Sequence, residues 1–477
     1  MTDPLALLPL AAAAGGGRMD AHDAARLVAA GLTLLRRSAP LVRALQDRRS
    51  AILLPTSPAF LVALAASEGR GAVLVNPLAA PPEIAHQLAD ADVGVVFTSA
   101  ALATRLPEGT PHVLLDDAPR TARVVAGGQA RDVALESHQG EALDLEGSTD
   151  TEGRDEEAAI VYTSAMAGRP LGAIITHRNL ISNARATIDA AEITAGEHAL
   201  ALLPFAHLFG LVVAGLAPLM AGGRVTTMER FNPLRAVDVI EREGITLLVG
   251  VPSVFAVIAQ VLERRGTALA APALRLCICG GAPLSIELQE RWEQLTGVAL
   301  RQGYGLTEAG PVCLFNRPSL PNRLGTLGVP FPDIEVQVHD PTRGAPLPDG
   351  AAGELWVRGP NVGPGYVRHG ALGLAKHGDW LRTGDLAVRH EDGTFAFRGL
   401  CKDMFTRNGF NIYPREIERA ALELPGVRTA TVRAIPDPMR EHDIALAVTG
   451  DVTLDAVKRW CAERLSAYKQ PSEITIE

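Results

Sequence analysis

Positive charge and cysteine are both scarce in this sequence of 477 residues. Lys and Arg total 45 against 54 Asp and Glu, and the resulting net charge of −9 disfavours a nucleic-acid-binding surface, which would need a basic patch. The 5 cysteines are an odd number and mostly lie far apart, so they fit a reducing cytosol better than a disulfide framework. Cys277 and Cys279 alternate along a predicted strand, where core packing is favoured over a metal pair.

Long apolar runs are also missing. Residues 5–14 form an apolar stretch, but spanning a bilayer takes roughly 20 residues, and no other uninterrupted run approaches that length. The stretch follows Asp3 rather than basic residues, so it does not match a secretory signal. We therefore expect a cytoplasmic protein with no membrane span, and a chain of this length predicts two or more domains.

Short apolar runs alternate with segments of helical spacing through the first part of the chain. Strands are predicted at 51–54, 72–75, 93–97, 158–161, 199–203, 225–228, 247–250 and 276–279, and helices at 24–39, 59–66, 81–89 and 182–191. This alternation is typical of an α/β layer architecture with a largely parallel sheet. The acidic segment 116–157 has weak periodicity, which predicts a solvated and poorly packed surface excursion.

The later part of the chain changes character. Residues 334–338 and 353–359 predict a turn-rich antiparallel segment. The run at 401–405 predicts a boundary between a large domain, 1–401, and a small α+β domain, 402–477. In that small domain helices are predicted at 414–422 and 454–465, and strands at 429–434 and 444–448.

The most informative stretch is residues 162–172, Tyr-Thr-Ser-Ala-Met-Ala-Gly-Arg-Pro-Leu-Gly, between two predicted strands. Hydroxyl residues, glycines and a proline are the composition of a tight loop whose backbone N–H groups cradle an anion. Such a loop holds phosphate better beside a cation, and Leu171 occupies the position where the cation is expected.

Two later loops carry groups that suit a nucleotide. Glycines at 280 and 281 follow a predicted strand and allow close backbone approach. Tyr304 lies between glycines and offers a flat face for a planar ring. Thr307 and Glu308 supply a hydroxyl and a carboxylate that suit a phosphate and its Mg²⁺, although a turn with an exposed glutamate is the alternative.

Two further polar residues remain. Asp385 follows a glycine turn and is well placed to accept hydrogen bonds from ribose hydroxyls. His207 follows the predicted strand 199–203 among apolar residues, and such a histidine taken alone is more often a core residue than a functional one.

Taken in order, these stretches resemble the adenylate-forming superfamily of acyl- and aryl-CoA synthetases, luciferases and peptide-synthetase adenylation domains. The similarity runs from about residue 24 to the end, and residues 409–418, Gly-Phe-Asn-Ile-Tyr-Pro-Arg-Glu-Ile-Glu, are nearest to fatty-acyl- and aryl-CoA ligases. The resemblance implies layered parallel-type sheets with helices and a small β segment, then a small mobile α+β C-terminal domain. It also implies that a carboxylic acid attacks Mg·ATP to give an acyl-adenylate, and that a thiol of CoA or of a carrier protein's phosphopantetheine then displaces AMP.

The resemblance also implies roles for single residues. The catalytic residues would be Thr307 at the α-phosphate, Glu308 as the Mg²⁺ ligand, His207 beside the reacting carboxylate, and Lys402 as the hinge. The cofactor-binding residues would be Thr163, Ser164 and Gly168 of the phosphate loop, Gly280, Gly281 and Ala282 at the adenine and acyl site, Tyr304 stacked on adenine, Asp385 on ribose, and Gly409 and Phe410 near the pantetheine.

The departures from this family pattern are concentrated at ATP-handling positions. Residues 165–167 are Ala, Met and Ala where a glycine and two hydroxyl residues are expected, and Leu171 replaces a lysine. Leu400 replaces an arginine that binds ribose, and Arg398 would compensate only if the strand register is regular.

The family's adenylation lysine would follow a segment like residues 468–471. The sequence ends at Glu477 before such a lysine, and Lys469 matches an earlier, different one. We therefore expect a shortened C-terminal domain and degenerate ATP-binding motifs.

Two hypotheses follow. The first is an AMP-forming acyl- or aryl-CoA synthetase-like enzyme with impaired or altered ATP use. Its acid would be apolar or aromatic, because the pocket segments expected at 205–210, 251–255 and 280–282 are largely apolar. The second is a non-catalytic relative that binds an acyl ligand, a nucleotide or a carrier-protein partner. A nicotinamide-dependent oxidoreductase is disfavoured, since no G-x-G-x-x-G follows a strand.

Overall fold

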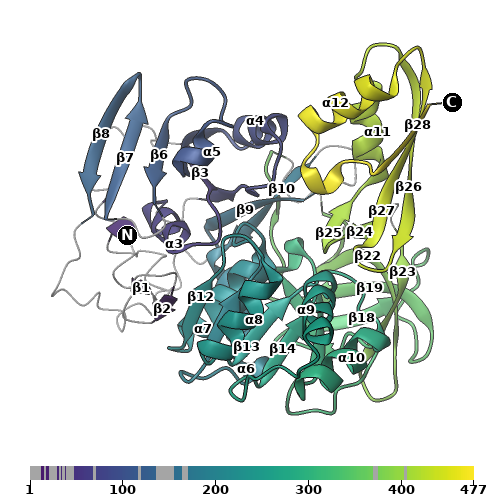
Figure 1. The fold of residues 1–477 in the computed structure, drawn as a ribbon. Helices are drawn as coiled ribbons and strands as arrows, with labels where there is room; N and C mark the ends of the chain where they lie inside the picture. The colour runs from purple at the N-terminus through teal and green to yellow at the C-terminus, as the bar shows by residue number, and fades with distance from the viewer. Residues whose placement is uncertain are drawn as a thin grey trace.

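The computed structural model describes residues 12–14, 18–20, 30–31, 34, 38, 48–67, 71–116, 120–135, 155–163, 170–368, 374–401 and 405–476. Ser164, Gly168 and Lys402 lie outside these residues, as do positions 165–167 and most of the helix predicted at 24–39. The described chain is a mixed α/β structure with a large sheet-rich part and a smaller C-terminal part, which confirms the predicted fold class (Figure 1).

The first large sheet has the strand order β1-β2-β12-β11-β13-β14-β15-β16-β17. Its strands are β1 (Ala12–Ala14), β2 (Arg18–Asp20), β11 (His198–Ala201), β12 (Arg224–Thr227), β13 (Leu247–Gly250), β14 (Leu276–Cys279), β15 (Leu300–Gly305), β16 (Val312–Phe315) and β17 (Val329–Pro330). Strands β12, β11, β13, β14 and β15 are parallel neighbours, and the strand order reverses beside β11. The central strands β13 and β14 are continuous apolar runs with every residue buried, as expected for strands that are covered on both faces.

Helices α7 (Ala217–Met220), α8 (Pro233–Arg242), α9 (Pro252–Arg265) and α10 (Ile286–Thr296) accompany this sheet, and α6 (His177–Ala191) is in contact with both large sheets (Figure 1). Helix α10 begins where the Ser285 hydroxyl accepts a hydrogen bond from the Leu288 amide at 3.2 Å. It ends at Gly297, whose φ of 71° suits a glycine. The turn at 280–282 is therefore held between β14 and a capped helix.

The second large sheet has the order β20-β10-β9-β4-β3-β5-β6-β7-β8. It contains β3 (Arg49–Leu53), β4 (Ala72–Leu74), β5 (Val93–Thr98), β6 (His112–Leu115), β7 (Thr121–Ala126), β8 (Gln129–Ala134), β9 (Glu157–Thr163), β10 (Leu171–Thr176) and β20 (Gly365–Tyr366), with helices α3 (Pro58–Ala66), α4 (Pro81–Asp90) and α5 (Ala100–Ala103). The surface excursion predicted at 116–157 is wrong for its first part. Strands β7 and β8 form a hairpin there, and Val124 and Val133 are buried against the core.

A smaller antiparallel sheet, β18-β19-β22-β21 with β23 beside β22, follows the first large sheet in the chain. Its strands are β18 (Glu335–His339), β19 (Ala352–Arg358), β21 (Lys376–His377), β22 (Trp380–Arg389) and β23 (Phe395–Leu400). The antiparallel segment expected at 334–338 and 353–359 is therefore confirmed. A register shift interrupts the β22–β23 ladder between Leu386 and Ala387.

The C-terminal part has its own hydrophobic cluster, which includes Ile417, Ile444 and Val457. It consists of β24 (Phe405–Arg407), β25 (Phe410–Ile412), α11 (Pro414–Leu422), β26 (Val427–Asp437), β27 (Glu441–Gly450), α12 (Leu454–Arg464), the 3₁₀ turn η5 (Ala467–Lys469) and β28 (Glu473–Ile476). The predicted helices and strands of this part are confirmed, and β28 adds a strand parallel to β27.

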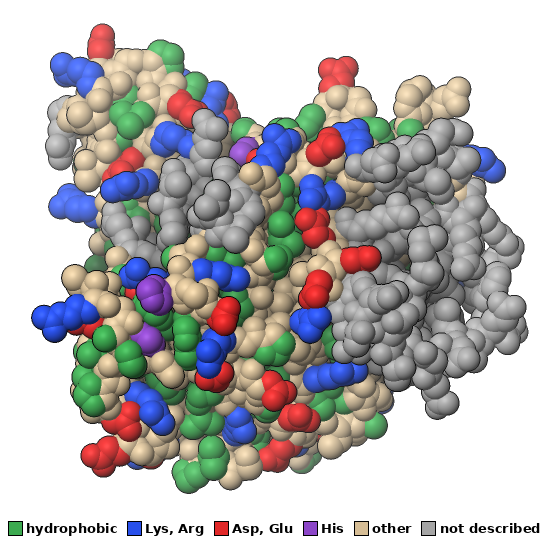
Figure 2. Space-filling model, turned by 180° about the vertical axis from the view of Figure 1, so that it is seen from behind, with side chains coloured by type: hydrophobic (Ala, Val, Ile, Leu, Met, Phe, Trp, Pro, Cys, Tyr) green, Lys and Arg blue, Asp and Glu red, His purple; other side chains and the backbone are tan. Residues whose placement is uncertain are grey.

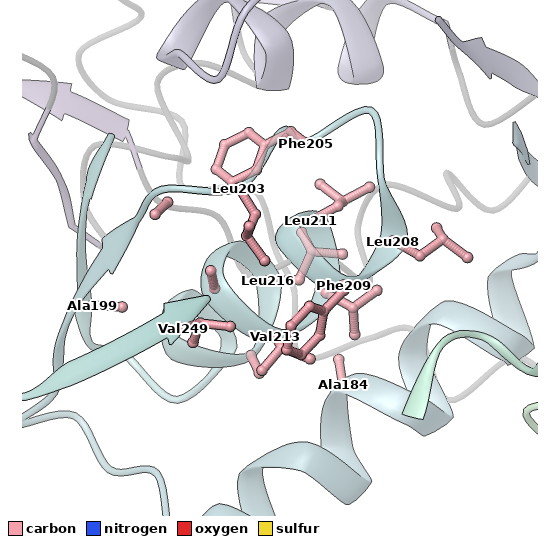
Figure 3. Packing of buried hydrophobic residues seen from close by; sticks show 14 of the residues in the cluster. Ala184, Ala199, Leu203, Phe205, Leu208, Phe209, Leu211, Val213, Leu216 and Val249 are labelled. Carbon is pink, nitrogen blue, oxygen red and sulfur yellow. The ribbon is translucent and has the colours of Figure 1, made fainter. Parts of the chain in front are cut away.

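A buried π-helix, η2 (Phe209–Leu216), follows β11 and fixes the turn that carries His207. Figure 3 shows Leu211, Val213 and Leu216 packed with Val249 of β13 and Ala184 of α6 in one apolar cluster. A Cβ at Gly210 would lie 2.4 Å from the carbonyl oxygen of Pro204, so the helix approaches that turn closely only because residue 210 is glycine.

Candidate active site

A cavity of about 270 Å³ lies between the large part and the C-terminal part of the described chain. It opens at the carboxyl ends of the parallel strands β14 and β15, where open α/β sheets bind ligands. Every predicted site residue that the structure describes lines it: Thr163, His207, Gly280, Gly281, Ala282, Tyr304, Thr307, Glu308, Asp385, Gly409 and Phe410.

Tyr304 and Asp385 form the polar end of the cavity. The Tyr304 hydroxyl donates to Asp385 Oδ2 at 2.5 Å, although the two residues belong to β15 and β22. Burial and the carboxylate of Asp385 raise the pKa of Tyr304 well above its ordinary value, so the phenol keeps its proton and remains a donor. This pair is a fixed polar edge beside a flat ring, which suits a nucleoside. Stacking of adenine on Tyr304 stays a prediction.

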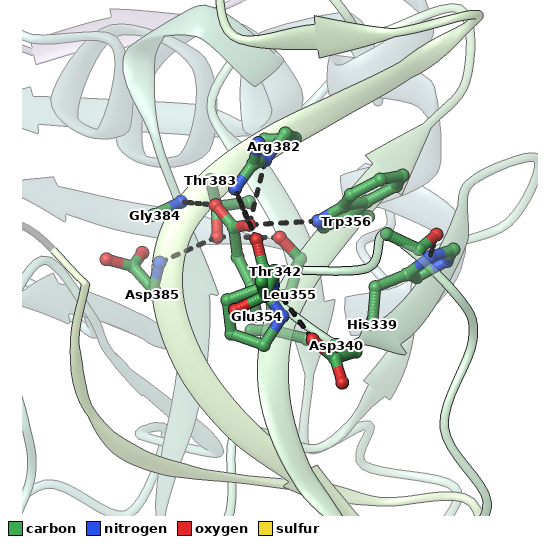
Figure 4. A network of polar contacts seen from close by, with 12 residues as sticks. His339, Asp340, Thr342, Glu354, Leu355, Trp356, Arg382, Thr383, Gly384 and Asp385 are labelled. Carbon is green, nitrogen blue, oxygen red and sulfur yellow. Dashed lines mark hydrogen bonds and ion pairs between the residues drawn. The ribbon is translucent and has the colours of Figure 1, made fainter.

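The glycine turn expected before Asp385 is wrong, because Gly384 and Asp385 lie within β22, where the pairing with β19 shifts register, and Glu354 holds this irregular part of the strand. Its carboxylate is 3% exposed and accepts hydrogen bonds from the Gly384 amide at 3.0 Å and from Arg382 Nε at 2.9 Å. The indole of Trp356 donates to the same carboxylate at 3.1 Å (Figure 4). The buried charge is therefore satisfied from three sides, and it fixes the backbone immediately before Asp385.

Glu308 occupies the next position around the cavity. Its Oε1 accepts a hydrogen bond from the Tyr366 hydroxyl at 2.6 Å. Burial and the charge of Glu308 raise the pKa of Tyr366, so this phenol also stays protonated. Among the described residues no group of three or more acidic, His or Cys side chains gathers as a metal site. Glu308 therefore fits Mg²⁺ only as the single carboxylate of an ion that also binds phosphate oxygens and water.

His207 lines the cavity and is neutral at physiological pH. Its Nδ1 accepts a hydrogen bond from the Phe209 amide at 3.2 Å, which leaves the imidazole proton on Nε2. Burial lowers the pKa of His207 to about 4. The residue is therefore a half-buried hydrogen-bond donor that lines the cavity, and its role beside a reacting carboxylate stays a prediction.

Phe209 and the glycines after β14 form the apolar end. A Cβ at Gly280 would lie 3.1 Å from Cζ of Phe209, so the aromatic ring packs tightly on the glycine backbone. The segment expected at 251–255 does not line the cavity. Val251 instead lies under Gly409, where a Cβ would be 2.5 Å from Val251 Cγ1. Val251, from a segment expected to line the acid pocket, thus contacts the C-terminal part instead.

The two lining positions where the family resemblance predicts a cation both hold leucine. Leu171 begins β10 directly opposite Thr163, and Leu400 ends β23 directly opposite Asp385, and both leucines line the cavity. The prediction that Arg398 compensates for Leu400 is wrong. The register shift between β22 and β23 leaves Arg398 without a partner residue in this strand pairing, and its side chain is exposed and does not line the cavity.

Lys469 is the lining residue whose importance the sequence did not reveal. Its Nζ donates to Glu83 Oε1 and Glu416 Oε1, each at 2.6 Å. Burial opposes its charge, but neighbouring Tyr468, Glu416 and Glu83 raise its pKa above the ordinary value. Lys469 and Arg382 are the permanently charged cations among the described lining residues, and both are already paired with carboxylates.

The chain matches the family model of AMP-binding enzymes over residues 22–367. The protein is a member of this family. It is 35% identical to a feruloyl-CoA synthase of Amycolatopsis sp. over 89% of this chain and 84% of the relative. It is 30% identical to 4-coumarate–CoA ligase 5 of Oryza sativa subsp. japonica, over 89% of this chain and 80% of that protein.

Solved structures agree with this assignment. A malonyl-CoA ligase in a ternary product complex with methylmalonyl-CoA and AMP superposes with a TM-score of 0.79 at 28% identity, covering 100% of this chain and 97% of the other. An amide bond synthetase of Marinactinospora thermotolerans has a TM-score of 0.78 at 24% identity, covering 100% and 96%, and supports the fold alone. In the described residues no helix is long and apolar enough to cross a membrane.

Proposed function

We propose that this family member is an AMP-forming ligase that activates an apolar or aromatic carboxylic acid and transfers the acyl group to a thiol. The observation that carries this proposal is the convergence of separate segments on one cavity. Tyr304 with Asp385, Thr307 with Glu308, and the 409–410 turn of the C-terminal part all line it. These groups suit adenosine, phosphate with Mg²⁺, and an incoming thiol, in that order.

The chemistry requires activation because a carboxylate is a poor electrophile. An oxygen of the acid attacks the α-phosphorus of ATP, pyrophosphate leaves, and a mixed acyl-phosphate anhydride forms. The thiol sulfur then attacks the acyl carbon, AMP leaves, and the thiol proton passes to solvent or to the departing phosphate. Mg²⁺, when bound, would neutralise charge on the phosphates, with Glu308 as its protein ligand.

The protein residues act by positioning and by charge placement. Neutral His207 would donate from Nε2 to the acid or to its acyl phosphate. Tyr304 and Asp385 would fix the nucleoside, and Thr307 would donate to the α-phosphate. Because the first two contacts use groups already ordered by the Phe209 amide and by Glu354, they need little reorganisation on binding.

An aromatic acid is the class that we favour. The apolar end is formed by Phe209, Ala206 and the glycine backbone at 280–281, with no charged side chain among these residues. A flat ring lies well against glycine backbone and an aromatic edge. The relatives named for ferulate and 4-coumarate point to the same class.

ATP is gripped weakly in this proposal. Leucine stands at both positions where the family has a cation, and the cations lining the described cavity are held by Glu83, Glu416 and Glu354. The same observation favours a second candidate, a binding protein that holds an acyl ligand, a nucleotide or a carrier-protein arm without turnover. The acceptor is CoA or a carrier-protein phosphopantetheine. We place the division between the domains at residue 402.

Pyrophosphate release and thioester formation separate these candidates. The purified protein would be assayed with Mg·ATP, CoA and a panel of ferulate, 4-coumarate, benzoate, hexanoate and malonate, beside thermal shifts with ATP, AMP and CoA. We expect turnover of the aromatic acids, a high KM for ATP, and no turnover of dianionic malonate. No pyrophosphate and no thioester with any acid would reject the ligase. Thermal stabilisation without turnover would support the binding protein.

A further inference from the structure

A buried ion cluster joins α4 of the large part to the C-terminal part. Lys469 Nζ donates to Glu83 Oε1 and to Glu416 Oε1, each at 2.6 Å, and the Ser466 hydroxyl donates to Oε2 of Glu83. The Lys469, Glu83 and Glu416 side chains are only 6%, 10% and 7% exposed. Figure 1 shows α4 facing α12 across this junction, and the two helices are in contact.

Both sides of the cluster are held rigidly. Glu83 lies in the first turn of α4, and its Oε2 also accepts the Ala80 amide at 2.7 Å. On the other side, Arg407 Nη1 donates to the carbonyl oxygens of Tyr468 and Gln470 at 3.1 and 2.8 Å, which fixes the turn that carries Lys469. The cluster is therefore a short contact between two preorganised groups, one from each part of the chain.

The cluster is linked to the cavity through an aromatic pair. The ring of Tyr468, the neighbour of Lys469, stacks on Phe410 with centroids 4.2 Å apart and planes 20° from parallel. Phe410 and Gly409 form one wall of the cavity, and Gly409 rests on Val251 of the large part. A displacement of Lys469 would consequently move the wall where the thiol is expected to enter.

We propose that Glu83 is a positioning residue for acyl transfer: by holding Lys469 it seats the Tyr468–Phe410 pair, and with it the 409–410 turn, against the cavity. The expected effect on acyl transfer rests on the proposed function, whereas the expected effect on the placement of the C-terminal part does not. Glu83 touches no reacting atom in this role, and it acts through Lys469. The sequence gives no hint of the pair, whose members lie 386 positions apart.

Glu416 provides a matched control. Its carboxylate is also 2.6 Å from Lys469 Nζ and is equally buried, but it belongs to the C-terminal part itself. Replacing either glutamate by glutamine removes one charge from the same lysine. Glu83 Oε2 also accepts hydrogen bonds from Ser466 and Ala80, whereas Oε2 of Glu416 has no hydrogen-bond partner among the described residues, so Glu83→Gln should lose more stability and each variant is compared at a temperature where it is folded. Only Glu83→Gln weakens the contact between the parts.

The kinetic arm measures two half-reactions separately. Thioester formation would be measured from synthetic feruloyl adenylate and CoA. Adenylation would be measured separately, as the release of pyrophosphate. We expect Glu83→Gln to lower kcat/KM for the thiol by about tenfold or more, while Glu416→Gln changes it by less than about threefold. Glu83→Asp keeps the charge on a shorter side chain, so its kcat/KM for the thiol should lie between those of Glu83→Gln and the unsubstituted protein. This variant replaces Glu83→Gln in the comparison if Glu83→Gln folds poorly.

The structural arm does not depend on activity. Gln260 of α9 contacts Met439 of the C-terminal part at 2.8 Å, so cysteines at these positions report the arrangement of the parts. In a Cys401→Ser background carrying Gln260→Cys and Met439→Cys, a short bis-maleimide should cross-link the two sites. We expect Glu83→Gln to lower the cross-linking rate and Glu416→Gln to leave it unchanged.

The outcomes distinguish the two proposals. Equal cross-linking rates in the Glu83→Gln and Glu416→Gln variants, whether lowered or not, would overturn the positioning role. A selective cross-linking change together with no thioester formation by the unsubstituted protein would support the seating of the C-terminal part and reject the ligase. A selective change with normal thioester formation in Glu83→Gln would overturn the link between that seating and acyl transfer.

Discussion

Replacing Leu400 by arginine should restore a nucleotide contact that the cavity lacks. Leu400 and Asp385 are directly paired across β22 and β23, which places their Cβ atoms about 4.5–5.5 Å apart on one face of the sheet. Leu400 lines the cavity beside Phe397, and the Tyr304 hydroxyl already binds Asp385 from the other side. A guanidinium at position 400 would therefore reach the region proposed for ribose.

The expected gain follows from the kind of contact. A hydrogen bond to a charged group contributes roughly 1.5–3 kcal/mol, which corresponds to about tenfold to 150-fold in Kd. Arginine would also pair with Asp385, and this intramolecular contact competes with the ligand. We therefore expect the lower end, about a tenfold decrease in Kd for both ATP and AMP.

Isothermal titration of ATP and AMP at one fixed salt concentration tests this expectation. Leu400→Met is the matched control, because it keeps the apolar volume and adds no charge. A further Leu171→Lys substitution should tighten ATP more than AMP, since position 171 begins the strand after the segment that we predict to hold phosphate. Equal Kd values for Leu400→Arg and Leu400→Met would refute the assignment of this position to nucleotide binding.

Three further predictions test the site. Burial lowers the pKa of His207 to about 4, so between about pH 6.5 and 4 the unfolded chain binds more protons than the folded protein. The free energy of unfolding should therefore fall by up to about 3 kcal/mol as the pH drops through that window. Denaturant titrations should show a smaller fall for the His207→Asn variant. Gly409→Ala should slow thioester formation, since its Cβ would meet Val251, and an added Val251→Ala should recover part of the loss. Glu354→Gln should raise KM for ATP, because it weakens the hydrogen bond to the Gly384 amide next to Asp385 in β22.

The buried parallel strands are the part of the fold that the sequence predicts well. Residues 247–250 and 276–279 are continuous apolar runs between turn residues, and the structure places β13 and β14 at those bounds. The β7–β8 hairpin was missed for a related reason. Only one face of this hairpin meets the core, so its polar outer face and its acidic surroundings hide the alternation of Ala122 and Val124.

The predicted site residues that the structure describes line one cavity, and most of them were found because they lie in short motifs near glycines; their roles stay predictions. Local geometry was less accessible. The irregular register that leaves Arg398 outside the cavity depends on how β22 pairs with β23, and no residue pattern marks it. The pairing of Glu83 with Lys469 depends on the placement of one part against the other, which sequence periodicity does not encode.

The charged side chains that line the cavity limit how it can bind a phosphate. Leu171 places no cation beside the predicted phosphate segment, and the lysine among the described lining residues is Lys469. Lys469 lines the same cavity, but Glu83 and Glu416 share its charge, so an approaching phosphate would compete with two buried carboxylates. Any gain in ATP affinity from freeing Lys469 would then come with a loss of the contact that seats the C-terminal part. Lys469 therefore cannot strengthen nucleotide binding without weakening the contact that holds the C-terminal part against the cavity. Substitutions at 171 and 400 can raise nucleotide affinity and leave that contact in place.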